Sequence, residues 1–374
     1  MFPYLRLARG YGFLDLCRCL LTAAASATVG ALLLSALGRA LSSPDDTGAA
    51  VERLLWCLPA LAAVGYLCAV WARSLPAQRP ERIAGLVAAG AGPVRTRLVL
   101  AGEIALICAL GAVLALLGFM VLREHWLELL PGGRLDPALG DRAELPAAGT
   151  VALLAVIPLL GGLAAGSAVR SVDLLPGDEA DRILRRPPVA YLVAVVLLAL
   201  AGAGIAVLGM RGHSSAEAWT AGVLGLLGLA GAVPALLYLV GGLLAAGRPR
   251  AVRLLAGRAL QAECWRLGAP LAVPAVAGAV VATLLLRNAP GSRPAGPLVL
   301  VEVLLLAVCV LGALLARLVE LARARRGSYA SLSRIGAPGG LLVRSAAVRG
   351  AATVLVATGV AAAAAALTAA ALAA

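Results

Sequence analysis

No lysine occurs in this chain of 374 residues, so all 32 of its basic side chains other than histidine are arginines. A nucleotide-binding P-loop needs a lysine that reaches the β- and γ-phosphates, and Schiff-base chemistry needs a lysine amine. We therefore expect the chain to be neither a P-loop ATPase itself nor a Schiff-base enzyme. Residues 178–181 spell a helicase box, but no phosphate-binding loop accompanies them, and we interpret them as polar linker.

Histidine, cysteine and aromatic residues are also scarce. The two histidines, His125 and His213, fall in predicted outer loops, and no His/Cys group has zinc spacing. None of the seven cysteines falls in a predicted outer loop, where a disulfide would persist, so we interpret them as small buried hydrophobic residues. Aromatic residues make up 4% of the chain and show no RNP-like pattern, which argues against nucleic-acid binding. We expect no catalytic residue and no metal.

Charged residues make up only 14% of the chain, against about 25% in an average soluble domain. The mean hydropathy is +0.96, and the apolar runs have the length that a helix needs to cross a hydrocarbon core of about 30 Å. These observations predict an all-α, polytopic membrane protein with about nine transmembrane helices. The nine runs are residues 19–38, 54–72, 98–122, 149–169, 189–209, 219–245, 268–285, 297–316 and 346–374.

The arginines are distributed unevenly along these runs. A cytoplasmic N-terminus places 24 of the 32 on the inner side and eight on the outer side, as the positive-inside rule requires. We therefore predict a multi-pass protein of the plasma membrane with the N-terminus inside and the C-terminus outside. The predicted cytoplasmic loops are 73–97, 170–188, 246–267 and 317–345.

Two acidic residues, Glu103 and Glu302, fall within predicted spans, where ionisable groups are costly and often functional. Glu103 follows Arg97 by six residues, or about 9 Å of helix, and Glu302 follows Pro297 by five, or about 7.5 Å. Each side chain can therefore reach toward its interface. A structural hydrogen bond or ion pair and a proton- or ion-relay role both remain open.

One pattern occurs twice, 246 residues apart. Leu86, Gly90 and Ala91 correspond to Leu332, Gly336 and Ala337, and an apolar run follows each copy. Arginines surround both copies, among them Arg82, Arg95 and Arg334. We expect at each copy a short surface helix that ends at the glycine, because glycine accepts the left-handed conformation at little cost.

The first copy resembles the signature of FtsX/MacB-like ABC transporter permeases. There a Leu-x-x-Leu-Gly-Ala cytoplasmic segment precedes a basic stretch and a helix with an early glutamate, the position of Glu103 here. The second copy is similar but weaker, and Arg349 stands where the first has the glutamate. The resemblance implies that both segments, 79–97 and 323–345, are coupling elements that dock on a separate subunit.

The same resemblance implies a permease half at 1–170, a cytoplasmic linker at 171–188 and a second half at 189–374. It implies a separate ABC ATP-binding subunit, in two copies, which binds the ATP and magnesium. It also implies export or extraction of a lipid, peptide or antibiotic-like substrate. Two departures from the family are the lack of a large extracytoplasmic domain and the lack of a tenth helix after the alanine-rich run at 361–366.

Other functions remain possible for such a chain. A stand-alone secondary carrier predicts inverted repeats, whereas both copies here precede outward-going helices. A membrane scaffold or enzyme is the third hypothesis, and an enzyme would show a cluster of catalytic polar residues. The arginines of the two copies could also lie at the bilayer interface and bind membrane lipid headgroups instead of a protein.

Overall fold

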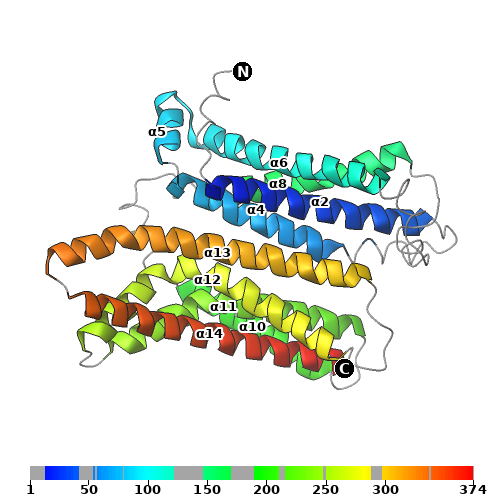
Figure 1. Ribbon diagram of the computed structural model, residues 1–374. Helices are drawn as coiled ribbons and strands as arrows, with labels where there is room; N and C mark the ends of the chain where they lie inside the picture. Colours follow the sequence, from blue (N-terminus) through cyan, green and yellow to red (C-terminus); the bar gives the residue numbers. More distant parts are fainter. Residues whose placement is uncertain are drawn as a thin grey trace. The chain divides into compact units, whose positions relative to one another are not determined.

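The computed structural model describes most of the chain and consists of helices throughout the described part (Figure 1). The described residues are 13–41, 54, 57–78, 80–121, 146–169, 189–209, 215–246, 250–287, 297–336 and 338–373. The helices are α2 (Phe13–Leu41), α4 (Leu58–Gln78), α5 (Pro80–Ala88), α6 (Pro93–Val121), α8 (Ala147–Ala168), α10 (Val189–Gly209), α11 (Ser215–Ala245), α12 (Ala251–Arg287), α13 (Pro297–Arg334) and α14 (Gly339–Ala373).

Within these residues, six helices are long and apolar enough to cross a membrane. Their candidate spans are Asp15–Leu41, Pro93–Val121, Ala147–Ala168, Leu224–Ala245, Leu300–Ala322 and Gly339–Ala369. Shorter apolar stretches lie in α4 and α12, and the remaining predicted run coincides with α10. Helices satisfy all backbone hydrogen bonds internally, which lipid demands of a spanning segment. The prediction of an all-α polytopic membrane protein is confirmed.

Two compact units divide the chain. Unit 1 contains residues 1–174 and 295–316, and unit 2 contains residues 175–294 and 317–374. Helix α13 therefore contributes its first part to unit 1 and its remainder to unit 2. The predicted linker 171–188 lies outside the described residues, and the division into two equivalent permease halves stays a prediction.

Unit 1 is a bundle in which α2 packs on α6, α6 on α8, and α4 on α8 (Figure 1). Its core is built from fully buried side chains such as Leu34, Leu67 and Ile157, together with Cys309 from α13. Small residues let the helices approach closely, because helix association within lipid depends on packing rather than on the hydrophobic effect. A Cβ atom added at Gly111 of α6 would lie 2.5 Å from the carbonyl oxygen of Ala23 in α2.

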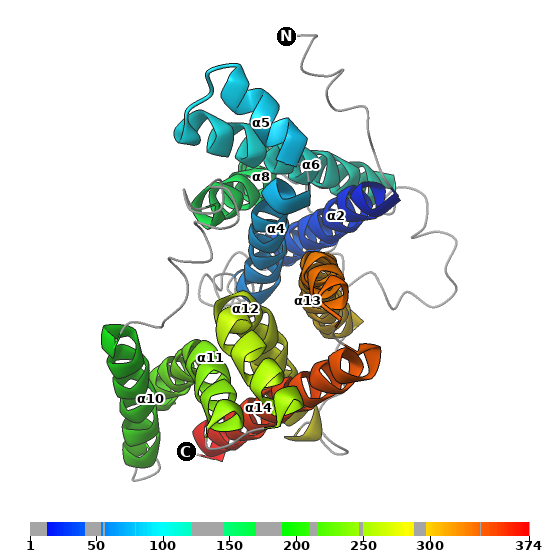
Figure 2. The same ribbon diagram turned by 90° about the vertical axis from the view of Figure 1, so that its left-hand side faces the viewer.

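Unit 2 packs α11 against both α10 and α12, and α14 lies against α11 and α12 (Figure 2). Its core contains Leu237, Leu260 and Val360, with Leu321 from the second part of α13. The ring of Tyr191 in α10 lies 4.8 Å from that of Trp265 in α12, and the Tyr191 hydroxyl donates a hydrogen bond to the carbonyl oxygen of Gly231. Leucine and valine side chains along α10 and α14 face outward, as lipid-facing positions do.

Two of the predicted connecting segments, 246–267 and 317–345, are largely helical and continue the neighbouring apolar helices, so these helices are longer than predicted. Helix α12 begins at Ala251, well before the apolar run at 268–285, and α13 continues to Arg334, far past residue 316. Residues 251–267 and 317–334 are rich in arginine. Their charged side chains lower the local hydropathy, but the backbone remains helical. These helical extensions form part of the candidate site beside Gly336, which is described below.

The cysteines fit the interpretation drawn from the sequence. All seven are free thiols, and five of them are buried in the helix packing. Cys68 of α4 and Cys108 of α6 are in contact, with their sulfur atoms 3.6 Å apart. Both histidines, His125 and His213, lie outside the described residues.

Candidate functional site

The first repeated pattern forms a helix end followed by a sharp turn. Helix α5 stops before Gly90, whose φ angle is +80°, a left-handed conformation that favours glycine. The N–H of Ala91 donates to the carbonyl oxygen of Leu86 at 2.9 Å, which is the six-to-one bond of a Schellman C-cap. The spacing of Leu86, Gly90 and Ala91 is therefore the spacing of this cap.

The next helix starts at once after this turn. Pro93 is the first residue of α6, a position where its fixed φ suits the helix and no N–H is needed. Both the N–H and the hydroxyl of Thr96 donate to the carbonyl oxygen of Gly92, at 3.0 and 3.2 Å. Proline and threonine thus fix the direction in which the apolar helix leaves the turn.

The second pattern forms the same kind of turn. Gly336 has a φ angle of +91°, and its N–H donates to the carbonyl oxygen of Ser333 at 3.1 Å, the five-to-two bond of the same cap. Pro338 then precedes α14 and accepts from the N–H of Leu341 at 3.0 Å. The glycine turn expected from the repeated pattern is present in both copies.

The helices that lead into the two turns differ. The first turn follows α5, a separate helix of 9 residues, as predicted. The second follows α13, which runs for 38 residues, so the expectation of a short surface helix at this position was wrong. The arginine-rich stretch after the α13 span continues the helix instead of interrupting it. The second turn therefore lies at the end of a long helix that contains a candidate membrane span, Leu300–Ala322.

Four of the seven described residues that were predicted to bind a partner are exposed. Gly90, Arg95, Arg334 and Gly336 are exposed, whereas Leu86, Ala91 and Leu332 are half-buried. Apolar side chains accompany them: Val94 is 64% exposed and Ile335 is 84% exposed. The side chain of Arg82 and all of Ala337 lie outside the described residues. Each turn thus presents apolar side chains among arginines.

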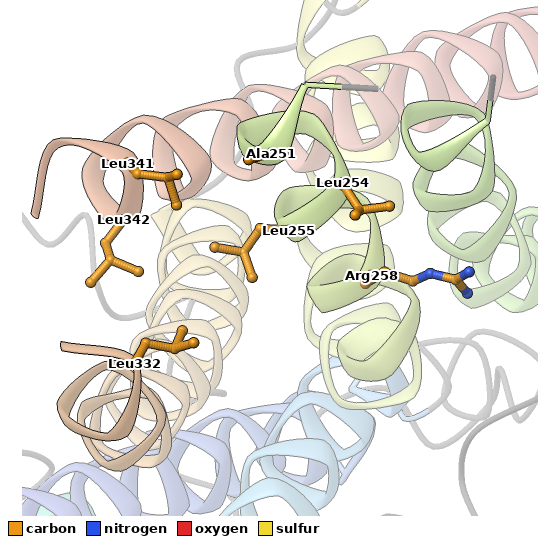
Figure 3. A pocket seen from close by; sticks show the side chains of 7 residues that line it. All are labelled: Ala251, Leu254, Leu255, Arg258, Leu332, Leu341 and Leu342. Carbon is orange, nitrogen blue, oxygen red and sulfur yellow. The ribbon is translucent and has the colours of Figure 1, made fainter. Parts of the chain in front are cut away.

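A cavity of about 310 Å³ opens beside the second turn (Figure 3). Its walls come from three helices of unit 2, namely the beginning of α12, the end of α13 and the beginning of α14. Leu332 is the one lining residue that the sequence pattern singled out. The lining residues are Ala251, Leu254, Leu255, Arg258, Leu332, Leu341 and Leu342. Sequence reasoning missed the α12 wall because it interpreted 246–267 as a loop.

An ion-pair cluster joins the same three helices. Arg325 of α13 donates from Nε to Glu263 Oε1 at 2.9 Å and from Nη2 to Glu263 Oε2 at 2.5 Å. Arg349 of α14 approaches Glu263 Oε1 through Nη1 at 3.5 Å, and its side chain is 8% exposed. Glu263 belongs to α12, so one carboxylate holds α12, α13 and α14 together. The three residues are separated in the sequence, and no local pattern indicates their association.

A buried arginine has a similar place in unit 1. Arg18 of α2 lies over the ring of Trp71 in α4, 4.3 Å from its centroid, and donates to the hydroxyl of Ser74. It also pairs with Asp15 one turn earlier, at 3.5 Å. These contacts fasten the end of α4 to α2, shortly before α5 begins. The sequence analysis did not single out any of these residues.

The two intramembrane acids do not form a single site. Helices α2 and α6 run parallel, since Gly111 faces Ala23 and Gly30 faces Ala115. Glu103 therefore lies near the beginning of α2. Glu302 lies near the opposite end, because its charge and that of Arg39 both act on Cys57. A direct relay between the two glutamates has no support in this arrangement, and within the described residues no group of His, Cys, Asp and Glu has the geometry of a metal site.

Comparison with protein-family models, with curated proteins and with solved structures found no match for this chain.

Proposed function

We propose that this chain is the membrane-spanning permease subunit of an ABC transporter. In this proposal a separate ATP-binding subunit, bound in two copies, holds ATP and magnesium and docks on the two glycine turns. The resemblance of the 79–97 and 323–345 segments to FtsX/MacB-like permeases motivates the proposal. The substrate class is a lipid, a peptide or an antibiotic-like molecule.

The observation that carries the proposal is the repetition of one capped turn in two places. Gly90 and Gly336 have positive φ angles, and a long apolar helix follows each within three residues. Such turns present backbone and exposed apolar side chains to a partner at a fixed angle to the membrane helix. A docking element must have this rigidity if movement of a partner is to move the helices.

The arginine contacts supply the second requirement of a coupling mechanism. Arg18 fastens α4, the helix that precedes α5 and the first turn. The Glu263 cluster fastens α13 and α14 on both sides of the second turn. A displacement of either turn therefore moves a set of packed helices rather than a single flexible segment. In the proposed mechanism, ATP hydrolysis in the partner changes the packing of these helices and thus the access of substrate to the membrane.

The proposal is tested by co-expressing the chain with ABC ATP-binding subunits from the same genome. Native mass spectrometry in mild detergent should show one permease chain with two ATP-binding subunits, and the permease alone should hydrolyse no ATP. Replacing Gly90 with Val should leave the membrane insertion intact and uncouple hydrolysis from transport in reconstituted vesicles. Isolated chains only, under these conditions, would contradict the proposal.

A further inference from the structure

The cavity beside the second turn is almost entirely apolar. Six of its seven lining side chains are apolar, and five of these six are leucines. They come from α12 and from both sides of the α13–α14 turn (Figure 3). A cavity of about 310 Å³ has the size of a small ligand pocket and is ample for a large side chain. The lining of the cavity is therefore suited to an apolar group.

The surroundings of the cavity are strongly basic. Exposed arginines lie within two residues of its lining, namely Arg250, Arg253, Arg334 and Arg344, and Arg258 lines the cavity itself. No acidic residue lies in 247–262 or 328–346. The nearest acid along the chain, Glu263, already pairs with two arginines. An occupant with acidic residues around its apolar group would be complementary in charge.

The distance from the cavity to the membrane-spanning stretches, counted along the helices, distinguishes a lipid from a protein as the occupant of the cavity. Leu332 lies ten residues past Ala322, where the α13 span ends, which corresponds to about 15 Å of helix. Arg258 precedes the apolar stretch of α12 by twelve residues, about 18 Å. The candidate span of α14 begins at Gly339, but Arg344 and Arg349 lie in its first eleven residues, so the uncharged part of the helix begins at Gly350. Leu342 precedes Gly350 by eight residues, about 12 Å. A tilt of about 20° shortens these distances by less than a tenth.

These distances exceed the thickness of the headgroup region, which is about 5–8 Å on each side of the hydrocarbon core. The acyl chain of a bilayer lipid would have to leave the membrane to fill the cavity. The cavity instead faces the compartment in which a soluble subunit would dock. The Glu263 cluster lies between the cavity and the uncharged parts of these helices, and therefore near the membrane interface.

We infer that the cavity bounded by Leu255, Leu332 and Leu342 receives one large apolar side chain of the ATP-binding subunit, from a surface that carries acidic residues. This inference rests on the proposed function and deepens it. The two docking elements would then work differently: α5 projects as a helix into the partner, whereas the second turn accepts a side chain from it. One permease chain thereby distinguishes its two ATP-binding subunits.

The test fills the cavity with a larger side chain and measures the affinity of the full-length chain in detergent for an ABC ATP-binding subunit from the same genome. Leu342→Trp should weaken binding at least tenfold, and Leu341→Trp, from the same wall, should act likewise. The matched control is Val343→Trp, because Val343 is the next residue, is 70% exposed and does not line the cavity. The control variant should bind the ATP-binding subunit with an affinity within twofold of that of the unmodified chain. Equal effects of Leu342→Trp and Val343→Trp would overturn the inference.

A second arm tests the charge. Arg253→Gln combined with Arg344→Gln should weaken binding and make the remaining affinity less sensitive to salt. Normal subunit binding by Leu342→Trp, together with loss of a lipid adduct in native mass spectrometry, would show a lipid cavity and overturn the inference. A failure of the unmodified chain to bind any ATP-binding subunit would instead overturn the proposed function, so the two failures are distinguishable.

Discussion

Arg325 donates two parallel hydrogen bonds, of 2.9 and 2.5 Å, to the carboxylate of Glu263, which lies 62 residues away in the sequence. Such a fork-to-fork pair fixes the relative orientation of two side chains as well as their distance. Because the partners belong to α13 and α12, the pair sets how the end of α13 lies against α12. Glu263 also holds Arg349, so α14 shares this restraint.

Replacing Glu263 with Gln should destabilise the protein more than any other loss of one acid in this unit. Two arginines would lose their counter-charge, and Arg349 is nearly buried. Breaking a fully buried pair costs roughly 3–5 kcal/mol, and the partial exposure of Arg325 lowers our expectation to about 2–3 kcal/mol. Thermal unfolding in detergent, followed by tryptophan fluorescence, measures the change.

The control for this substitution is Glu320→Gln. Glu320 accepts from Arg317 at 2.7 Å, but both belong to α13 and lie three residues apart. Pairs at this spacing contribute about 0.2–0.5 kcal/mol, so the midpoint should move little. Similar losses from both substitutions would contradict a joining role for Glu263.

Alanine at either turn glycine should strain the backbone without any steric clash. Gly90 and Gly336 have positive φ angles, and a Cβ atom at either would meet nothing within 4 Å. The left-handed conformation costs a residue with a Cβ about 1–2 kcal/mol, so Gly90→Ala and Gly336→Ala should each destabilise by that amount. Chemical denaturation of the purified variants measures it.

Gly85→Ala provides the matched comparison. Gly85 lies inside α5 with ordinary helical geometry and open space around it. Alanine is the better helix former by about 0.8–1.0 kcal/mol, so this variant should be neutral or more stable. If Gly85→Ala and Gly90→Ala behave alike, the turn conformation is not what glycine supplies at position 90.

The glycine turns were predictable from the sequence because a Schellman cap is local. The spacing of Leu86, Gly90 and Ala91 reflects bonds within one helix end, and the apolar runs reflect the thickness of the membrane. Nothing local, by contrast, indicates that residues 251–267 and 317–334 continue their helices. Their stability depends on partners such as Glu263 and Arg325, which only the folded chain brings together. The α12 wall of the cavity escaped prediction for the same reason.

Substitution of Arg18 should loosen α4 from α2. Its guanidinium stacks on Trp71 and donates to Ser74 in a buried setting. A desolvated cation–π contact contributes about 2 kcal/mol and a hydrogen bond to a charged group about 1.5–3, so Arg18→Gln should cost about 2–3 kcal/mol. Arg18→Lys should restore little of this, because lysine keeps the charge but lacks the planar fork. Full rescue by lysine would mean that only the charge matters.

The predicted orientation can be tested by cysteine labelling on a cysteine-free background. Ala89 and Ile335 are exposed beside the two turns and avoid the strained glycine positions. Ala89→Cys and Ile335→Cys should react with a membrane-impermeant maleimide only after the cells are permeabilised. His213→Cys, in a predicted outer loop, should react in intact cells. Labelling of position 89 from outside would make the topology derived from the arginine distribution wrong.

The close crossing of α11 and α12 can be tested with two alanine substitutions in the same helix, α12. A Cβ atom added at Gly257 of α12 would lie 2.5 Å from the carbonyl oxygen of Gly241 in α11, a backbone atom that cannot rotate away. Gly257→Ala should therefore separate the two helices and destabilise unit 2 by about 1–3 kcal/mol, the usual cost of overpacking. Gly278→Ala in the same helix meets nothing within 4 Å and should be neutral or stabilising.

Because both changes add the same methyl group to α12, a difference in their unfolding midpoints isolates the contact with α11. Equal midpoints would show that α11 and α12 can shift apart without loss, and that this crossing does not fix the wall of the cavity.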